Sequence, residues 1–417
     1  MNKNKKIQEA LKKERGITLV ALVITIIILI ILATIAIRGA VGDDGLIGWA
    51  KEARDKTKQG EEEEDQTMSD LDAYIEEQTE DTSGDSNAPS TVTDAKTNSY
   101  VFKSKTPIKD EKNNTIMIPA GFKIASDSGD TVQQGIVIED VNASNDTNVQ
   151  GSQYVWIPVG TFTKDNGSTS GNIILGRYTF DTSTGTPTLK QNAENYTQSV
   201  VINTYFTELS TYRVGVASDG KDGLNATAKD LKGFIDSVNS NGGYYIGRYE
   251  ASYASGSSTE NYKAASKISD GYSEGSMSYN PRTLWNFITQ IDASKVAINT
   301  YAGSTSVKSD LINSYAWDTA IVYIQEAGNS NYANQTSKNT SLANTGANND
   351  EVCKINDMAS NMLEWTTEYS SYISSHAAYP CTIRGGFYYN SGYSADSRLD
   401  NNATGSHNRG FRLSLYL

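Results

Sequence analysis

The hydrophobic positions of the chain begin with one long uncharged run near the N-terminus. Residues 17–37 are rich in Ile, Leu and Val and carry no charged side chain. In a helix, which rises about 1.5 Å per residue, such a run spans roughly 30 Å, the thickness of a bilayer core. The pattern therefore predicts a long N-terminal transmembrane helix.

Charges on either side of this run predict its orientation. Lys and Arg are concentrated in residues 1–16, whereas Asp43, Asp44 and an acidic cluster at 61–64 follow the run. By the positive-inside bias, we expect a single-pass protein of the bacterial cell membrane, with a cytoplasmic N-terminus and a large extracellular domain. A cleaved secretory signal is the alternative, although its apolar region would be shorter.

Beyond the run, the pattern divides the chain into a stalk, a linker and an outer domain. Apolar residues are sparse among charges up to residue 80, so 17–80 is predicted to be a transmembrane helix that continues as a solvated stalk. Residues 81–99 are rich in Ser, Thr, Asp and Asn and are predicted to form a flexible linker. The outer domain is expected to span 100–417.

The outer domain alternates strand-like and helix-like patterns. Short apolar runs predict strands over Thr115–Pro119, Gly135–Glu139 and Tyr154–Val159. Apolar spacing predicts a helix within Asp310–Glu326, and a Pro suited to the first turn favours another over Pro281–Ile291. Strands interleaved with helices and many loops indicate an α+β fold class.

Composition and charge narrow the function. The formal net charge of −13 repels the phosphate backbone of nucleic acids, so we expect no nucleic-acid partner. The only cysteines, Cys353 and Cys381, lie in the outer domain, where a disulfide and two free thiols are both open. No cofactor is expected. The Asn- and Asp-rich stretch Asn344–Asp350 is open to two interpretations, a structural calcium site and ordinary turns.

The boundary of the apolar run resembles the type IV prepilin signal. In Lys13–Val20 a basic leader ends at Gly16 and the apolar helix begins at Ile17. The resemblance implies cleavage between Gly16 and Ile17 by a prepilin peptidase, and pilin-like subunits as partners. The sequence departs from the family at Ala21, where pilins usually place the Glu that guides subunit packing.

Five segments of the outer domain resemble motifs of the formylglycine-generating, or sulfatase-modifying-factor, family. They follow one another in the family's order: Tyr154–Val159, Gly243–Glu250, Asn356–Thr366, Arg384–Gly386 and Arg409–Leu413. The resemblance implies the C-type-lectin-like fold of that family. We therefore expect a domain of this type behind the prepilin-like segment.

Charged residues in these motifs have a structural explanation. An interior accepts the charges of Glu364, Arg384, Arg409 and Arg412 only as paired, hydrogen-bonded groups, so we expect buried ion pairs that fix loop geometry. Gly385 and Gly386 are expected to allow close backbone approach. These motifs thus predict a framework rather than a catalytic centre.

The chemistry of the family's enzymes is missing from the sequence. Members that oxidise cysteine to formylglycine use a Cys pair shortly after Arg-Gly-Gly, where sulfur ligands suit Cu(I). The corresponding residues, 387–393, contain no cysteine. With only His376 and His407, the chain cannot supply a three-His iron site. We therefore expect no enzymatic activity.

The segment between the last two motifs has the composition of a recognition loop. Tyr gives stiff contact area, while Ser, Asn and Gly give adaptable hydrogen bonding. Such segments also resemble the variable regions made by diversity-generating retroelements. The residues predicted to bind ligand are Phe387, Tyr388, Tyr389, Asn390, Tyr393, Asp396, Arg398, Asp400, Asn401, Asn402, His407 and Asn408. A plain surface loop is the alternative.

Taken together, these features predict a non-enzymatic display protein of the cell surface. It would adhere to an unidentified protein or glycan ligand through its C-terminal segment. The alternative that the prepilin-like segment leaves open is a minor pilin or pseudopilin of a type IV pilus-like filament.

Overall fold

A computed structural model describes residues 24–29, 87–142, 144–198, 200–208, 230–337, 340–347, 349–370, 381–402 and 404–417. The chain divides into two compact units, Met1–Ser83 and Gly84–Leu417. In the first unit only 24–29 is described, as a helical segment with exposed Ile and Leu side chains. The leader over 1–16, the predicted processing site at Gly16 and Ile17, and the stalk lie outside the described residues.

The second unit corrects the predicted fold class, because its described residues form mainly β-sheets with few helices. The helices are α3 (Val92–Thr97), α4 (Leu231–Asn241), α5 (Gln290–Thr300) and α6 (Ser314–Glu326), with short 3-10 turns at Val132–Gln134, Ala193–Asn195 and Tyr332–Asn334. The prediction of an α+β fold preceded by a long transmembrane helix is therefore wrong.

The predicted membrane localisation is corrected by the same structure. No helix among the described residues has the length and apolar character needed to cross a membrane. The single-pass membrane protein with a cytoplasmic N-terminus is thus not supported.

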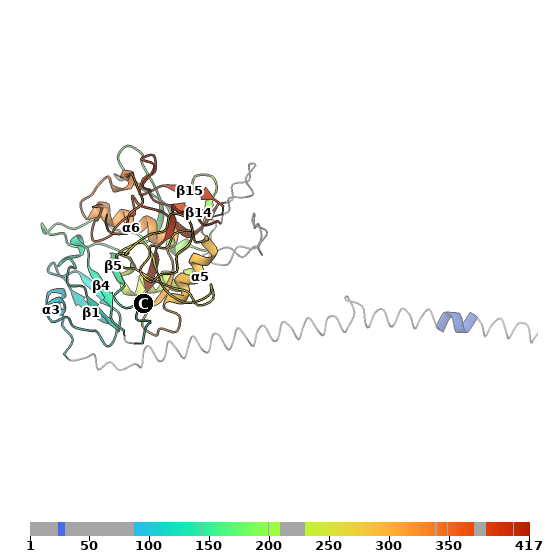
Figure 1. The fold of residues 1–417 in the computed structure, drawn as a ribbon, viewed down its shortest axis with the longest axis horizontal. Coiled ribbons are helices and arrows are strands. Elements are labelled where there is room, and N and C mark those ends of the chain that lie inside the picture. The colour runs from blue at the N-terminus through green and yellow to red at the C-terminus, as the bar shows by residue number, and fades with distance from the viewer. Residues whose placement is uncertain are drawn as a thin grey trace, which may run out of the picture. The chain divides into compact units, whose positions relative to one another are not determined.

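A six-stranded antiparallel sheet forms the centre of the second unit (Figure 1). Its order is β12 (Lys308–Leu311), β17 (Leu413–Tyr416), β9 (Gly243–Gly247), β5 (Gln153–Pro158), β4 (Val137–Asp140) and β3 (Phe122–Ile124). Every residue of β9 is buried, and the rings of Trp156 and Tyr245 pack edge to face at 5.1 Å. The last strand of the chain is therefore held inside the sheet, between two partners.

A second sheet carries the C-terminal motifs. Its order is β15 (Arg398–Asn401), β14 (Cys381–Arg384), β13 (Leu363–Ser370) and β16 (Arg409–Phe411), and β8 (Phe206–Thr207) also pairs with β13. In Figure 1, β14 and β15 lie side by side in red. Three hairpins complete the strands: β1 (Thr106–Lys109) with β2 (Thr115–Ile118), β6 (Gly176–Phe180) with β7 (Pro187–Asn192), and β10 (Ser252–Ser255) with β11 (Lys263–Ala265).

Most of the locally patterned elements are confirmed. The three predicted strands are β2, β4 and β5, and α6 forms within Asp310–Glu326. The helix predicted over Pro281–Ile291 is wrong, since Arg282 and Phe287 have φ of 68° and 58°, which a right-handed helix does not contain. The second unit also includes α3, whose Val92 and Ala95 are fully buried, although the sequence assigns them to a linker.

Candidate ligand-binding site

The C-terminal segment lines a hollow of about 340 Å³ beside the second sheet. We call it the recognition hollow. Five residues predicted from the sequence line it: Phe387, Tyr393, Asp400, Asn401 and Asn408. The other lining residues are Leu363, Ile383, Leu399 and Arg409, which the sequence reasoning missed.

Strand alternation builds the floor of this hollow. Successive residues of a strand point to opposite faces, and Ile383 pairs directly with Leu399, while Leu363 pairs with Arg409. These residues belong to β13, β14, β15 and β16, and Asp400 and Asn401 at the end of β15 complete the lining. The missed floor residues come from segments far apart in the sequence, so only the register of the sheet reveals them.

The opposite face of the same strands carries charge. Arg384 of β14 pairs with Arg398 of β15. Each is the strand neighbour of a floor residue, Ile383 or Leu399, so its side chain points to the opposite face of the sheet. Arg398 donates to Glu368 at 2.8 Å and to Asp318 at 2.7 Å, and Arg384 donates to Asp318 at 2.6 Å. The side chain of Arg398 is only 4% exposed. Arg398, predicted to contact ligand, instead belongs to a buried ion-pair network.

This network stabilises its charges mutually. Burial by itself raises the pKa of Glu368, but the guanidinium groups of Arg398, Arg177 and Arg384 outweigh it and lower that pKa to about 2. Burial lowers the pKa of Arg398, whereas Asp318 and Glu368 raise it more strongly, so the net shift is upward. These ion pairs hold β13, β14 and β15 to α6.

A second buried pair confirms the predicted framework. Arg412 reaches both carboxylate oxygens of Glu364, at 2.6 and 3.1 Å, and also donates to the carbonyls of Gly247 and Asn356. A Cβ at Gly386 would lie 2.1 Å from the carbonyl oxygen of Ala359, so this turn requires glycine. The motif residues thus fix the strands from which the segment departs.

Further contacts position the segment itself. The indole N–H of Trp317, on α6, donates to the carbonyl of Ala395 at 3.0 Å. The carboxylate of Asp396 accepts from the Ser394 hydroxyl at 2.5 Å, and Asn402 accepts from Arg409 at 3.0 Å. Asp396 and Asn402 therefore stabilise the shape of the loop.

Aromatic residues form an exposed rim. Tyr389 is 79% exposed, and its ring lies 6.5 Å from that of Tyr388. The ring of Tyr388 also lies 6.5 Å from His407, which is exposed, as is Asn390. Phe387, by contrast, is buried and stacks on Tyr393 at 5.5 Å. The segment thus has an anchored base and an outward-facing edge.

Polar groups at the hollow are available for a ligand. Among the described residues, the side chains of Asp400, Asn401 and Asn408 have no hydrogen-bond partner. They stand beside the apolar floor of Leu363 and Ile383. Most of the surface that lines the hollow is polar, so a ligand there would be held chiefly by hydrogen bonds.

The remaining candidate sites from the sequence are the two cysteines and the Asn344–Asp350 stretch. No disulfide joins Cys353 and Cys381, and burial raises the pKa of the Cys353 thiol to about 12. Within the described part of the chain, no three His, Cys, Asp or Glu residues are grouped as a metal site would require. In the Asn344–Asp350 stretch, Thr345 and Gly346 donate to the carboxylate of Asp357, each at 2.7 Å.

Comparison with known proteins adds little. No protein-family model matches the chain. No curated protein matches it either. Among solved structures, the chain is similar to one titled Major Tropism Determinant M1 Variant, with 12% identity, 76% of this chain and 82% of that chain covered, and a TM-score of 0.22. So low a score carries no argument, and the sulfatase-modifying-factor and prepilin resemblances gain no support from a family match.

Proposed function

We propose that this chain is a non-enzymatic, adhesion-type ligand-binding protein that recognises its target with residues 387–408. The observation that carries the proposal is the recognition hollow, where Asp400, Asn401 and Asn408 offer unpartnered polar groups beside an apolar floor. Its volume of about 340 Å³ lies at the small end of the range for ligand pockets. It would take one sugar ring or one side chain of a protein ligand, and the Tyr388 and Tyr389 rim would extend the contact.

The rigid framework supports this proposal. Binding costs less free energy when the contact residues are held in place before the ligand arrives. The base of the segment is fixed by Arg384 and Arg398 on Asp318 and by Trp317 on Ala395. On ligand binding, only the exposed edge around Tyr389 would then have to become ordered.

The absence of enzymatic activity is part of the proposal. Residues 387–393, which follow Arg384–Gly386, contain no cysteine. The thiol of Cys353 is protonated near neutral pH because burial raises its pKa to about 12, and a protonated thiol is a poor nucleophile and metal ligand.

We also propose that the fold is related to the C-type-lectin-like domain of the sulfatase-modifying-factor family. The motif residues Glu364 and Arg384 pair across adjacent strands, and Arg412, between β16 and β17, forms an ion pair with Glu364, as parts of one framework would. The recognition segment lies between the last two of these motifs.

The proposal is tested by applying the full chain to arrays of glycans and of immobilised proteins. A triple variant, Tyr389→Ala with Asn401→Ala and Asn408→Ala, should lose binding by about 2 kcal/mol or more, since central interface tyrosines have effects of this size. Leu189→Ala, at an exposed position of β7, is the control and should bind normally. Undiminished binding by the triple variant, at an unchanged melting temperature, would place recognition elsewhere.

A further inference from the structure

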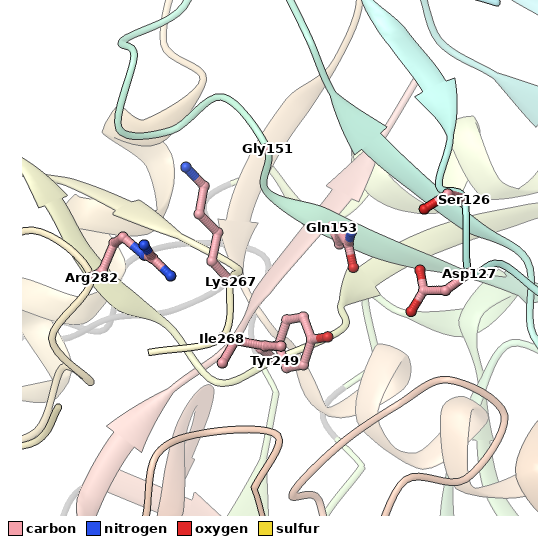
Figure 2. Close-up of a pocket in the computed structure, with 8 residues that line it drawn as sticks. All are labelled: Ser126, Asp127, Gly151, Gln153, Tyr249, Lys267, Ile268 and Arg282. Carbon is pink, nitrogen blue, oxygen red and sulfur yellow. The ribbon is translucent and has the colours of Figure 1, made fainter. Parts of the chain in front are cut away.

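A second hollow, of about 440 Å³, shares no lining residue with the recognition hollow. We call it the basic hollow. Ser126 and Asp127 follow β3, Tyr249 follows β9, and Lys267 and Ile268 follow β11. Figure 2 shows Lys267 and Arg282 together on one side, Ser126 and Asp127 on the other, and Tyr249 and Ile268 between them.

The two cations of this hollow are incompletely neutralised. The Lys267 ammonium donates to the carbonyl of Asn148 at 2.7 Å, and no carboxylate among the described residues lies within ion-pair distance of it. Arg282 pairs with Asp270 at 2.9 Å, but these side chains are 50% and 59% exposed, where such a pair contributes little. Two neighbouring cations therefore lack a firm anionic partner.

The electrostatics of Lys267 agree with that geometry. Burial first, and then the nearby Arg282, lower the pKa of its ammonium, while Asp140, Glu139 and Asp146 act in the opposite direction with smaller effect. A bound anion would relieve the repulsion between the two cations.

The backbone holds Arg282 in an uncommon conformation. Its φ is 68°, which a non-glycine residue rarely adopts, and its amide donates to the carbonyl of Tyr253 at 2.8 Å. The amide of Asp270 in turn donates to the carbonyl of Arg282 at 2.8 Å. Backbone conformations of this kind concentrate where a side chain must be positioned for function.

The other lining residues suit a ligand that carries hydroxyl groups and an apolar face. The hydroxyls of Ser126 and Tyr249 have no hydrogen-bond partner among the described residues. Asp127 accepts from Arg248 at 2.8 Å and keeps a second carboxylate oxygen that can accept from a ligand hydroxyl. Ile268 is 51% exposed beside them.

We propose that the basic hollow binds an acidic sugar, with the sugar carboxylate on Lys267 and Arg282. The ring hydroxyls would meet Ser126, Asp127 and Tyr249, and the apolar edge of the ring would rest on Ile268. A carboxylate suits this site because Arg282 presents a fork of N–H donors beside the single ammonium of Lys267. The carboxylated sugar is bound either free or as the end of a polysaccharide.

The test is an NMR titration of the full chain with galacturonate, with galactose as the matched sugar that lacks the carboxylate. Galacturonate should bind saturably, and galactose about tenfold or more weakly, as expected for loss of a charged hydrogen-bonded group. An oligogalacturonate in a parallel titration separates the two sources, since tighter binding than the monomer indicates a polysaccharide end. Equal binding of galactose, or equal binding of inorganic phosphate, would overturn the assignment.

Variants connect binding to the named residues. Lys267→Gln and Arg282→Gln should each weaken galacturonate binding about tenfold or more, whereas Lys267→Arg, which keeps the charge, should retain most of it. Lys232→Gln, at a 69% exposed lysine of α4, is the control and should bind like the unmodified chain. Equal melting temperatures show that the variants fold. Unchanged affinity in Lys267→Gln would refute the proposal.

Discussion

Replacing Arg398 tests whether it belongs to the framework or to the recognition surface. In Arg398→Met, the side chain loses its bonds to Glu368 at 2.8 Å, to Asp318 at 2.7 Å and to the carbonyl of Tyr178 at 3.3 Å. The side chain is 4% exposed, and both carboxylates are fully buried. Water therefore cannot replace the lost guanidinium.

The expected cost follows from that burial. Removing one partner of a buried ion pair typically destabilises a protein by about 3–5 kcal/mol, because the remaining charge is left uncompensated. Arg177 and Arg384 still face Glu368, so we expect a loss near the lower end, about 3 kcal/mol.

Urea unfolding followed by tryptophan fluorescence measures this loss. The midpoint should fall with little change in slope, while Tyr389→Ala, at a 79% exposed position, should stay within about 0.5 kcal/mol of the unmodified chain. A loss below about 1 kcal/mol for Arg398→Met, together with lost ligand binding, would refute the framework assignment.

Three further predictions concern buried groups. Burial, and then Glu368, raise the pKa of Glu208 from 4.5 to about 7. Between these two pH values the folded protein keeps a proton that the unfolded chain releases, so the folded state becomes less stable as pH rises. In Glu208→Gln, which cannot ionise, the free energy of unfolding should fall by about 3 kcal/mol less over this pH range. Identical plots of unfolding free energy against pH between 4.5 and 8 for the two proteins would contradict this prediction. Gly386→Ala should lower the melting temperature because the new Cβ would lie 2.1 Å from the Ala359 carbonyl, and an unchanged melting curve would show that the turn relaxes. The thiol of Cys353 should react with a thiol reagent at neutral pH far more slowly before urea unfolding than after it, since burial raises its pKa to about 12.

The sequence was sufficient where local pattern decides structure. The apolar runs of β2, β4 and β5 and the motif charges Glu364 and Arg412 led to the strands and the ion pair that the structure contains. In each case neighbouring residues, or the cost of burying a charge, determine the outcome.

It was insufficient where register decides which way a side chain points. Arg398 and Leu399 are adjacent, yet one joins the ion-pair network and the other lines the hollow, and a shift of one residue would exchange them. The basic hollow was not predicted either, because Ser126, Tyr249 and Lys267 come from separate segments that only the fold brings together. The positive φ of Arg282 and Phe287 prevents the helix that was predicted over Pro281–Ile291. The hydropathy of the sequence gives no sign of such backbone angles.

Hydroxyl-radical footprinting of the full chain, with and without the ligand found on the arrays, tests the central claim most directly. Oxidation reports the solvent exposure of individual side chains, and the exposed Tyr389 and His407 with the half-buried Tyr388 form the rim of the proposed surface. We expect the ligand to protect these three residues while Tyr279, which is 47% exposed and outside the segment, reacts as before. Protection confined to residues outside 387–408, with Tyr389 still fully reactive, would contradict the account.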